Sequence, residues 1–389
     1  MATVTKANPL HIDWVLFIIS FSLLGLGYVM MVSASLHLGM KLSGNSMYYP
    51  LRQLIHMIIG LLAGLVVIST PLKVWQRQGS TLFLIGMALL IVVLIPGIGV
   101  KVNGSSRWLS IVGIRIQASE LMKLISVIYI AGYVERHQKT VRRAALGLFK
   151  PLILVALVCI LLLLEPDFGS AVVIVTIVVG VMYLAGARLA QFVLLLAVGS
   201  VTAMLLIYSA PYRLARVISF LNPWADAQNT GFQLVQALIA FGRGELTGVG
   251  LGNGVQKIFY LPEAHTDFLF SVLAEELGLV GVITVIGLFT ALILRAFIIG
   301  AKAERHGQKF AAFSAYGLGI WFGFQAFINM GVNMGILPTK GLTLPLMSYG
   351  GGSMIIMCAS VALLFRIYSE VNEYQLLGTK HRKREWIDT

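Results

Sequence analysis

Three titratable side chains stand within five positions in one short stretch, LPEAHTDF at residues 261–268. Glu263, His265 and Asp267 are of the types that most often transfer a proton in catalysis, so the stretch predicts a site with a general base. The residues alone leave open which of the three acts. For His265, a structural role in holding a loop is the favoured reading.

A second pair of charges, Glu120 and Lys123, lies in an apolar stretch. Their spacing of three places both on one face of a helix, where they are able to pair. An ionised side chain near the bilayer centre costs about 2.5 to 3.5 kcal/mol on insertion scales, so such residues face the interior of a bundle or a cavity. The pair is either a structural link between helices or part of the lining of a site.

Two further segments combine polar residues with helix breakers. EPDFGS at residues 165–170 places Glu165 and Asp167 around a tight turn, which its proline and glycine explain without the two carboxylates. LPTKGLTLPLMSYGGGS at residues 337–353 interrupts a helix around Lys340 and Ser348. Irregular backbone at membrane depth is tolerated where it lines a polar cavity or is buried in protein.

Membrane-spanning helices must position these groups. With 58% hydrophobic and 12% charged residues and a mean hydropathy of +0.88, the chain is an integral membrane protein and not a soluble globule. Apolar runs long enough to cross about 30 Å of hydrocarbon recur along its whole length. We expect an all-α bundle of about ten transmembrane helices, at residues 13–34, 53–70, 81–99, 117–133, 147–164, 169–187, 189–209, 267–294, 310–337 and 343–365.

Basic residues predict the orientation of this bundle. With the N-terminus inside, the cytoplasmic segments hold 18 Lys and Arg residues and the outer segments ten. Both termini are then cytoplasmic, and residues 366–389 form a basic cytoplasmic tail. Ten outer basic residues are more than the positive-inside bias predicts, and an anionic ligand on the outer face would explain them. Nucleic acid is excluded as a partner, because no soluble domain is present to hold a duplex.

The longest connection, residues 210–266, joins the seventh and eighth spans on the outer face of a single polytopic membrane domain, residues 1–389. Apolar residues at helical spacing from Phe232 to Ile239 predict a short amphipathic helix in this loop. GVGLGNG at residues 248–254 is superficially like a phosphate-binding loop, but no strand precedes it, and a folded-back turn is the favoured interpretation.

The predicted topology places the polar segments at the same, outer end of the bundle. These are residues 261–268 and 165–170, together with Glu120, Lys123 and Lys340. They are too far apart in the sequence for local structure to explain their common location. The sequence therefore predicts one outward-facing site that contains both carboxylates and cations.

The segments that carry these groups also resemble a known family. They are NGSSRWLSIVGIRIQASELMKL at 103–124, EPDFGSA at 165–171, YLPEAHTDFLFSVLAEELG at 260–278 and ILPTKGLTLPLMSYGGGS at 336–353. In order and topological position they are similar to the SEDS (shape, elongation, division and sporulation) family of bacterial membrane glycosyltransferases. The loop segments resemble the cell-division member more than the elongation member. Two positions depart from the pattern: Ala118, where proline is more frequent, and Gly352, where serine is frequent.

The resemblance implies that the chain polymerises lipid II, the lipid-linked disaccharide precursor of peptidoglycan, into glycan strands during septal cell-wall synthesis. It implies that Asp267 is the general base, which deprotonates the acceptor hydroxyl in an inverting transfer that displaces undecaprenyl pyrophosphate. One essential carboxylate is enough, because pyrophosphate is already a good leaving group. Glu165, Asp167, Glu263 and His265 then support the site.

Cations are expected to grip the substrate pyrophosphates, arginine as a planar fork and lysine as a point charge. Glu120 would orient Lys123, and Ser348 lies in the interrupted helix. The substrate-binding candidates are Arg52, Glu120, Lys123, Arg213, Arg216, Lys257, Lys340 and Ser348. No cofactor is certain, and a divalent cation, Mg²⁺ or Mn²⁺, that Glu263 would help to bind is left open.

The resemblance also implies partners and a location. The partners are a class B penicillin-binding protein transpeptidase, regulatory division membrane proteins, lipid II and membrane lipid, and the location is the bacterial cytoplasmic (inner) membrane at the division septum. Two rival functions are a lipid II flippase and a non-enzymatic division scaffold. Transporters usually bind substrate near the midplane of repeated halves, and here the polar groups cluster at one end without an internal repeat. A scaffold function does not explain why carboxylates and lysines lie in apolar surroundings at the outer end.

Overall fold

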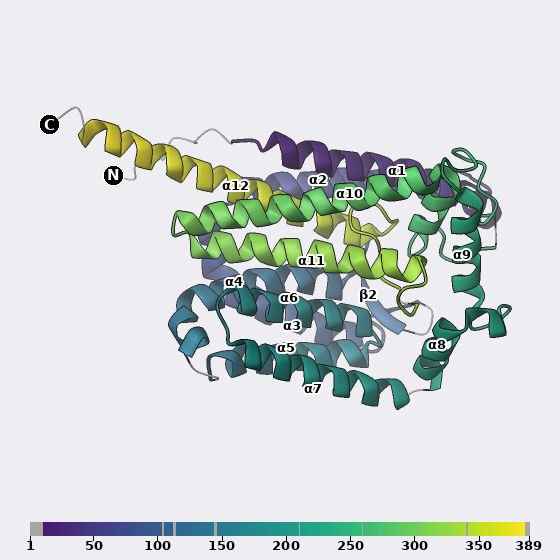
Figure 1. The fold of residues 1–389 in the computed structure, drawn as a ribbon, viewed down its shortest axis with the longest axis horizontal. Helices are drawn as coiled ribbons and strands as arrows, with labels where there is room; N and C mark the ends of the chain where they lie inside the picture. The colour runs from purple at the N-terminus through teal and green to yellow at the C-terminus, as the bar shows by residue number, and fades with distance from the viewer. Residues whose placement is uncertain are drawn as a thin grey trace.

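The computed structural model describes residues 11–102, 105–111, 114–143, 146–209, 211–258, 260–339 and 341–385. Figure 1 shows a bundle of long helices that run roughly side by side, with shorter helices across one end. The long helices of the bundle are α1 (Trp14–Ser43), α2 (Tyr48–Ser69), α3 (Leu72–Leu94), α4 (Ala118–Arg143), α5 (Leu146–Leu164), α6 (Phe168–Leu184), α7 (Leu189–Tyr208), α10 (Leu269–Arg305), α11 (Lys309–Asn333) and α12 (Gly351–Glu385).

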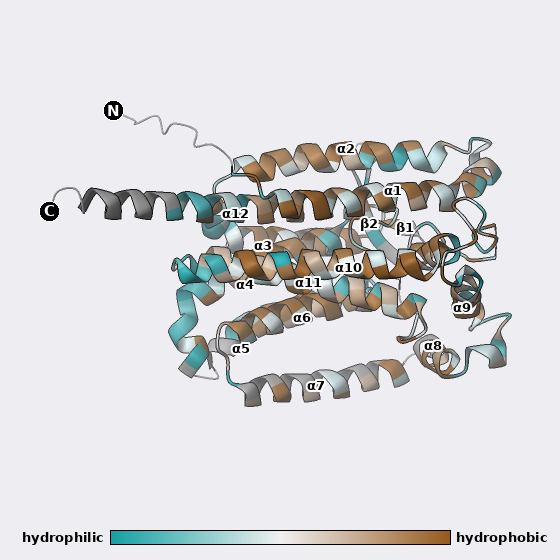
Figure 2. Cartoon of the chain, turned by 45° about the horizontal axis from the view of Figure 1, so that its top comes forward, coloured by the Kyte–Doolittle hydropathy of each residue, from teal (hydrophilic) through white to brown (hydrophobic). Residues whose placement is uncertain are grey.

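Each predicted span corresponds to one of these helices, so the all-α membrane fold is confirmed. By length and composition, six of the described helices could cross a membrane, namely α1, α2, α3, α10, α11 and α12. Helices α5 and α6 contain shorter apolar stretches, at Lys150–Leu164 and Phe168–Leu184. Figure 2 shows hydrophobic residues along the bundle and hydrophilic residues gathered toward its ends.

Several predicted boundaries were wrong, because hydropathy detects only the part of a helix that lies in hydrocarbon. Helix α3 begins at Leu72, directly after Pro71, whereas the apolar run predicted a start at residue 81. Helix α10 continues past residue 294 to Arg305. The last span begins at Gly351 and not at residue 343, because residues 341–350 form an irregular segment, as the prolines and glycines there predicted.

A small antiparallel sheet between α3 and α4 was not predicted. It consists of β1 (Val100–Val102), β2 (Ser105–Ile111) and β3 (Ile114–Gln117), in that order. Strand β3 packs on the first turn of α12, where a Cβ atom at position 352 would lie 2.8 Å from the Ile116 Cα. The glycine at this position therefore permits a close approach of the sheet that a serine would obstruct.

The loop predicted at residues 210–266 contains α8 (Pro211–Leu221), the 3₁₀ turn η1 (Pro223–Asp226) and α9 (Phe232–Gly244). The predicted amphipathic helix is α9, which packs against α10, for example where the ring centroids of Phe241 and Phe270 lie 5.7 Å apart. Helix α8 was not predicted. In Figures 1 and 2, α8 and α9 lie across the bundle axis, and we call this end of the bundle the outer end.

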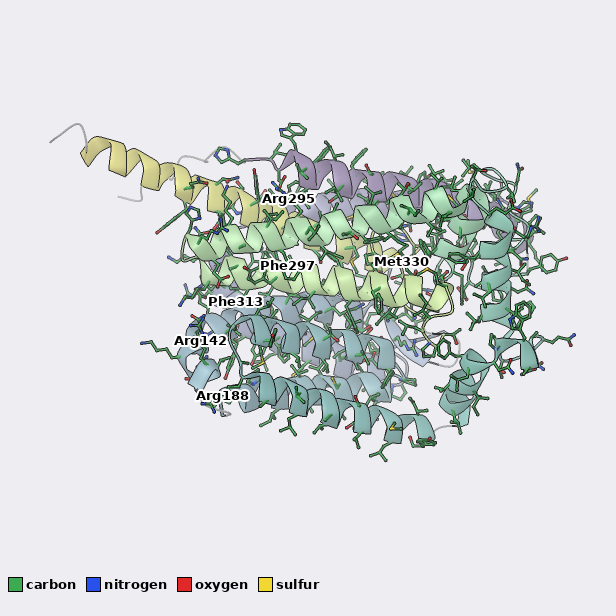
Figure 3. All side chains as sticks on the ribbon, viewed as in Figure 1. Arg142, Arg188, Arg295, Phe297, Phe313 and Met330 are labelled. Carbon is green, nitrogen blue, oxygen red and sulfur yellow. The ribbon has the colours of Figure 1, made fainter. Side chains whose placement is uncertain are left out.

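Helix α11 occupies the centre of the bundle, where it contacts α4, α6, α10 and α12. The start of α1 lies at the end opposite α9, where His11 N donates to Ser369 Oγ of α12 at 3.2 Å, and α12 projects beyond it (Figure 1). Figure 3 places Arg142 and Arg188 at that same end and Met330 toward the outer end. Arg295 forms an ion pair with Asp13 at 2.7 Å, which joins α10 to the N-cap residue of α1.

Candidate functional site

Asp267 lies at the outer end, two residues before the start of α10. Its backbone carbonyl accepts hydrogen bonds from Asn329 Nδ2 at 2.8 Å and from Asn333 Nδ2 at 3.0 Å. Its side chain lies against the backbone at Gly341, where an added Cβ would stand 2.9 Å from Asp267 Oδ2. The carboxylate is partly exposed, as a proton acceptor that must meet a substrate requires.

The first turn of α10 is capped by a neighbouring helix. Phe268 occupies the N-cap position and has no side-chain acceptor to offer. Asn333 of α11 replaces it, because its Oδ1 accepts hydrogen bonds from Ser271 N at 3.0 Å and Ser271 Oγ at 2.7 Å. The position of Asp267 thus depends on α11 as well as on its own helix.

His265 is buried between two aromatic rings, those of Tyr49 and Tyr349, with ring centroids at 5.0 and 5.3 Å. Its backbone carbonyl accepts a hydrogen bond from Tyr349 N at 2.9 Å. Burial lowers the pKa of this imidazole, and the nearby Glu263 carboxylate opposes that shift. A neutral, packed ring agrees with the structural role predicted for it.

Glu263 stabilises the turn before Asp267. Its φ of 57° is in the left-handed region, and Thr266 Oγ1 donates to its carboxylate at 2.9 Å. Its backbone carbonyl accepts from Thr266 N and Phe268 N. The carboxylate is exposed and lies close enough to Tyr49 for its charge to act on that residue, as does the charge of Arg52.

Arg52 projects from the outer end of α2 and is exposed. Its guanidinium lies over the ring of Tyr48, 4.3 Å from the centroid, and its charge reaches Tyr349. The next residue, Gln53, is buried and donates to Ser348 O at 3.3 Å. Arg52 therefore lies beside the irregular segment at residues 341–350, which the side chain of Asp267 also contacts at Gly341.

Ser348 holds the irregular segment at residues 341–350 in shape. Its hydroxyl oxygen accepts from Leu344 N at 2.9 Å, and its own N–H donates to Leu344 O at 3.1 Å. The side chain is buried. These contacts use Ser348 for the local fold of the segment.

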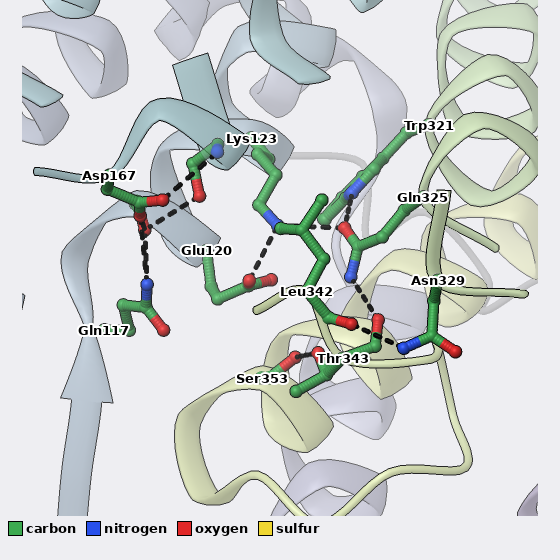
Figure 4. A network of polar contacts seen from close by, with 12 residues as sticks. Gln117, Glu120, Lys123, Asp167, Trp321, Gln325, Asn329, Leu342, Thr343 and Ser353 are labelled. Atoms are coloured by element: carbon green, nitrogen blue, oxygen red, sulfur yellow. Dashed lines mark hydrogen bonds and ion pairs between the residues drawn. The ribbon is translucent and has the colours of Figure 1, made fainter. Parts of the chain in front are cut away.

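The predicted pairing of Glu120 and Lys123 is present, with Lys123 Nζ 2.6 Å from Glu120 Oε1 and both side chains buried (Figure 4). Lys123 also donates to Gln325 Oε1 at 2.9 Å. Gln325 accepts from Trp321 Nε1 at 2.8 Å and donates to Thr343 O at 3.0 Å. The ion pair of α4 is thereby tied to α11 and to the irregular segment.

Asp167 forms a second buried group at the outer end of α4 and α6. Its carboxylate accepts from Ser119 Oγ at 2.8 Å, from Gln117 Nε2 at 3.1 Å and from Ser170 N at 3.2 Å (Figure 4). These contacts make Asp167 the N-cap of α6 and its link to β3 and α4. Figure 4 shows this group beside Glu120.

Glu165 is buried, and neither of its carboxylate oxygens has a hydrogen-bond partner. Arg107 donates to the backbone carbonyls of Glu165 and Pro166, at 2.9 and 2.8 Å, and not to the carboxylate. Burial, and then the charge of Asp167, raises the pKa of Glu165 to about 8, against the influence of Arg107. The side chain is therefore largely protonated at neutral pH.

Lys257 belongs to a separate buried cluster below the glycine-rich turn. Its ammonium lies 2.5 Å from Glu276 Oε1 and donates to Ser33 Oγ at 2.7 Å and Gly252 O at 2.8 Å. The lysine therefore joins the loop to α10 and α1. The Lys257 ammonium is held by these protein groups, and none of its contacts in this cluster involves Asp267.

The glycine-rich turn folds back on α10, as predicted. The Glu275 carboxylate accepts from the N–H groups of Val255 and Gln256, and Glu276 accepts from Gly252 N. These carboxylates occupy donors that a phosphate would need. Gly248 has a φ of 81°, and a Cβ there would lie 2.1 Å from Glu276 O, so the turn requires glycine.

Sequence reasoning missed several residues that shape the site. Gln325, Asn329 and Asn333 are spaced four apart on α11 and are all buried, a pattern visible in the sequence as amides on one face of an apolar helix. Glu275 and Glu276 were also missed, although two adjacent carboxylates inside a span are a signal of function or structure.

Three predicted residues cannot be assigned contacts. Lys340 lies outside the described residues, and the side chains of Arg213 and Arg216 on α8 lie outside them as well. Within the described part of the chain, no group of three or more His, Cys, Asp or Glu side chains has an arrangement that could hold a metal ion.

The structure thus brings Asp267, Lys123 and Glu120 into one polar network through α11 and residues 341–343. Arg52, His265 and Ser348 border this network, Asp167 and Glu165 lie on its α4 side, and Lys257 is apart. The arrangement defines a class of polytopic membrane protein with a partly exposed carboxylate and a buried ion pair at one end of the bundle.

A family model described as cell cycle protein, which covers FtsW, RodA and SpoVE, matches residues 14–373. The chain therefore belongs to this family. A protein of Methylomonas methanica named probable peptidoglycan glycosyltransferase FtsW is 60% identical over 378 residues, which cover 97% of each chain. A protein of the same name from Methylococcus capsulatus is 58% identical over 364 residues, 94% of this chain and 92% of that one.

Solved structures show the same architecture. A chain from a peptidoglycan synthase complex, described as coordinating polymerization and crosslinking, matches with a TM-score of 0.77 and 28% identity over 93% of this chain and 99% of that one. The rod shape determining protein RodA of Thermus thermophilus matches with a TM-score of 0.68 and 26% identity, over 92% and 97%.

Proposed function

We propose that this protein is a peptidoglycan glycosyltransferase that polymerises lipid II into glycan strands during septal wall synthesis. The observation that carries the proposal is the partly exposed Asp267 at the outer end, in a chain that shares 60% identity over its length with a relative named for this activity. Asp267 takes the proton of the acceptor hydroxyl, which attacks the anomeric carbon of the donor with inversion and displaces undecaprenyl pyrophosphate.

The surroundings of Asp267 support this role. Its backbone is fixed by two amides of α11, so the carboxylate is held in place before substrate arrives. Arg52 is an exposed guanidinium at the same end and supplies a forked cation for a pyrophosphate. Lys123, paired with Glu120, supplies a cation that acts only at short range. A divalent cation, Mg²⁺ or Mn²⁺, bound with the help of Glu263 remains part of the proposal.

We further propose the setting in which the enzyme works. The chain lies in the bacterial cytoplasmic membrane at the septum, with both termini cytoplasmic and the site on the outer face. Its partners are a class B penicillin-binding protein transpeptidase and regulatory division membrane proteins. The similarity to a chain of a complex described for polymerization and crosslinking supports such a pairing.

The proposal is tested with purified protein, alone and with the transpeptidase, given lipid II in detergent with Mg²⁺, with Mn²⁺ and with chelator. Glycan chains are separated on a gel for the wild type, Asp267→Asn and Glu245→Gln, the last an exposed acid of the same loop that serves as a matched control. Polymer from the wild type and the control, and none from Asp267→Asn, is expected.

Two results contradict the assignment. Polymer from Asp267→Asn at the wild-type rate refutes the general base. Absence of polymer from the wild type, together with movement of lipid II across liposome membranes, refutes polymerisation and supports a flippase. Activity that needs no added metal and survives the chelator removes the divalent cation from the mechanism.

A further inference from the structure

Three buried amides form a line along one face of α11. Gln325, Asn329 and Asn333 are four residues apart, so each stands about 6 Å from the next along the helix axis. Their exposed fractions are 0%, 1% and 0%. A buried amide without partners is costly, so the contacts that each one makes are the reason it is tolerated. We call these three residues the amide ladder.

The outer part of the ladder holds Asp267. Asn329 and Asn333 both donate to its backbone carbonyl, at 2.8 and 3.0 Å. Asn333 also caps α10 through Ser271, and its own amide nitrogen donates to Asn329 O at 2.8 Å. These contacts fix the position of the Asp267 backbone along the axis of α11.

The inner part of the ladder holds the cation and the irregular segment. Asn329 donates to Leu342 O at 2.6 Å and Gln325 donates to Thr343 O at 3.0 Å, as Figure 4 shows. Gln325 Oε1 accepts from Lys123 Nζ at 2.9 Å. Asn329 is thus the residue that binds both the Asp267 backbone and residues 341–343.

We propose that Gln325, Asn329 and Asn333 are positioning residues that set the distance between the Asp267 carboxylate and the Lys123 ammonium. In an inverting transfer the acceptor and the leaving pyrophosphate lie on opposite sides of one anomeric carbon. A base on one side and a cation on the other must then be held at a fixed separation, and a misplacement of about 1 Å can cost about 100-fold in rate. The inference rests on the proposed glycosyl transfer.

Packing alone does not account for the ladder. Apolar side chains of similar volume would fill the same positions in an apolar helix without any desolvation cost. Amides instead join four segments that are distant in the sequence: α4, the start of α10, α11 and residues 341–343. Removal of the donor from one rung should therefore affect two of these segments together.

Three variants and a control test this on the full chain with its transpeptidase. Asn329→Leu removes the middle rung. Asn333→Asp keeps the acceptor that caps α10 and loses the donor to Asp267. Gln325→Glu keeps the acceptor for Lys123 and loses the donor to Thr343. Ser314→Ala, a buried residue of α11 outside the ladder, is the matched control.

The first measurement is steady-state polymerisation of lipid II with its pH profile. We expect kcat to fall about 100-fold in Asn329→Leu, with KM changed less than about threefold, and the acidic limb of the kcat profile to shift in Asn333→Asp. Ser314→Ala should keep wild-type values. A lower melting temperature with unchanged kcat and pH profile per folded enzyme would show a merely structural role and overturn the proposal.

The second measurement is amide hydrogen exchange, which does not depend on activity. Asn329→Leu should raise exchange by about tenfold in residues 266–271 and in residues 341–348 together, and Ser314→Ala should change neither. A rise in one segment only, or in none, refutes the ladder. If the wild type makes no polymer, the proposed function fails, and this exchange result still decides whether the ladder couples the two segments.

Discussion

Lys257 and Glu276 form a buried ion pair whose loss can be predicted in sign and size. The Lys257 side chain is 3% exposed, the Glu276 side chain is 0% exposed, and their charged atoms lie 2.5 Å apart. Lys257→Met keeps the length of the side chain and removes its charge. Glu276 then stays buried with only two donors, Ser33 Oγ and Gly252 N.

Removal of one partner from such a pair costs about 3 to 5 kcal/mol, because the remaining charge is uncompensated. The two remaining donors keep the cost near the lower value, and we expect the free energy of unfolding to fall by about 3 kcal/mol. Adding Glu276→Gln removes the stranded charge, while the amide oxygen still accepts from Ser33 and Gly252. The double variant should therefore be about 2 kcal/mol more stable than Lys257→Met alone.

The assay is unfolding in mixed micelles by titration with SDS, followed by circular dichroism. Arg243→Met is the matched control, because Arg243 faces the adjacent Glu275 at 3.6 Å but is 42% exposed. We expect it to cost no more than about 1 kcal/mol. If Glu276→Gln makes Lys257→Met less stable, or if Arg243→Met costs as much as Lys257→Met, burial of the charge is not the cause.

Three further outcomes follow from other sites. The pKa of Glu165 is raised to about 8, so its contribution to stability is complete below about pH 4 and is lost as pH rises through 8. Glu165→Gln should therefore make the melting temperature less dependent on pH between about pH 5 and 8.5. Gly248→Ala should abolish the folded fraction in size-exclusion chromatography, because its Cβ would meet the Glu276 carbonyl. Gly252 has a φ of 87° but open space around it, so Gly252→Ala should lower the free energy of unfolding by only about 1 to 2 kcal/mol. Equal yields of the two folded variants would refute this explanation of the turn. His265→Phe should retain polymerisation and its pH profile, since the ring is packed and neutral, and loss of one limb of the profile would instead make the imidazole an acid or base.

Local sequence pattern was sufficient to find the long helices, though not α8 or the exact boundaries, and to predict contacts within one helix. Glu120 and Lys123 could be paired from their spacing, and α9 from its apolar periodicity, because both depend on residues a few positions apart. The small sheet could not be predicted, since β1 and β3 are only three and four residues long, β1 pairs with β2, and β3 packs on α12. Lys257 appeared to be a free outer cation, because its partner Glu276 is 19 positions away across a folded loop.

The buried pairs change the account of positive charge at the outer end. Lys123 and Lys257 each lie against a glutamate, so each pair is close to neutral as a unit and exerts a weak field at a distance. Of the predicted phosphate-binding cations whose side chains are described, Arg52 is the exposed one. In the proposed function, attraction of an anionic head group therefore falls first to Arg52. The proposal then gives Lys123, which is buried and paired with Glu120, a role only at short range. Capture of the substrate and its alignment for reaction would thus fall to different residues.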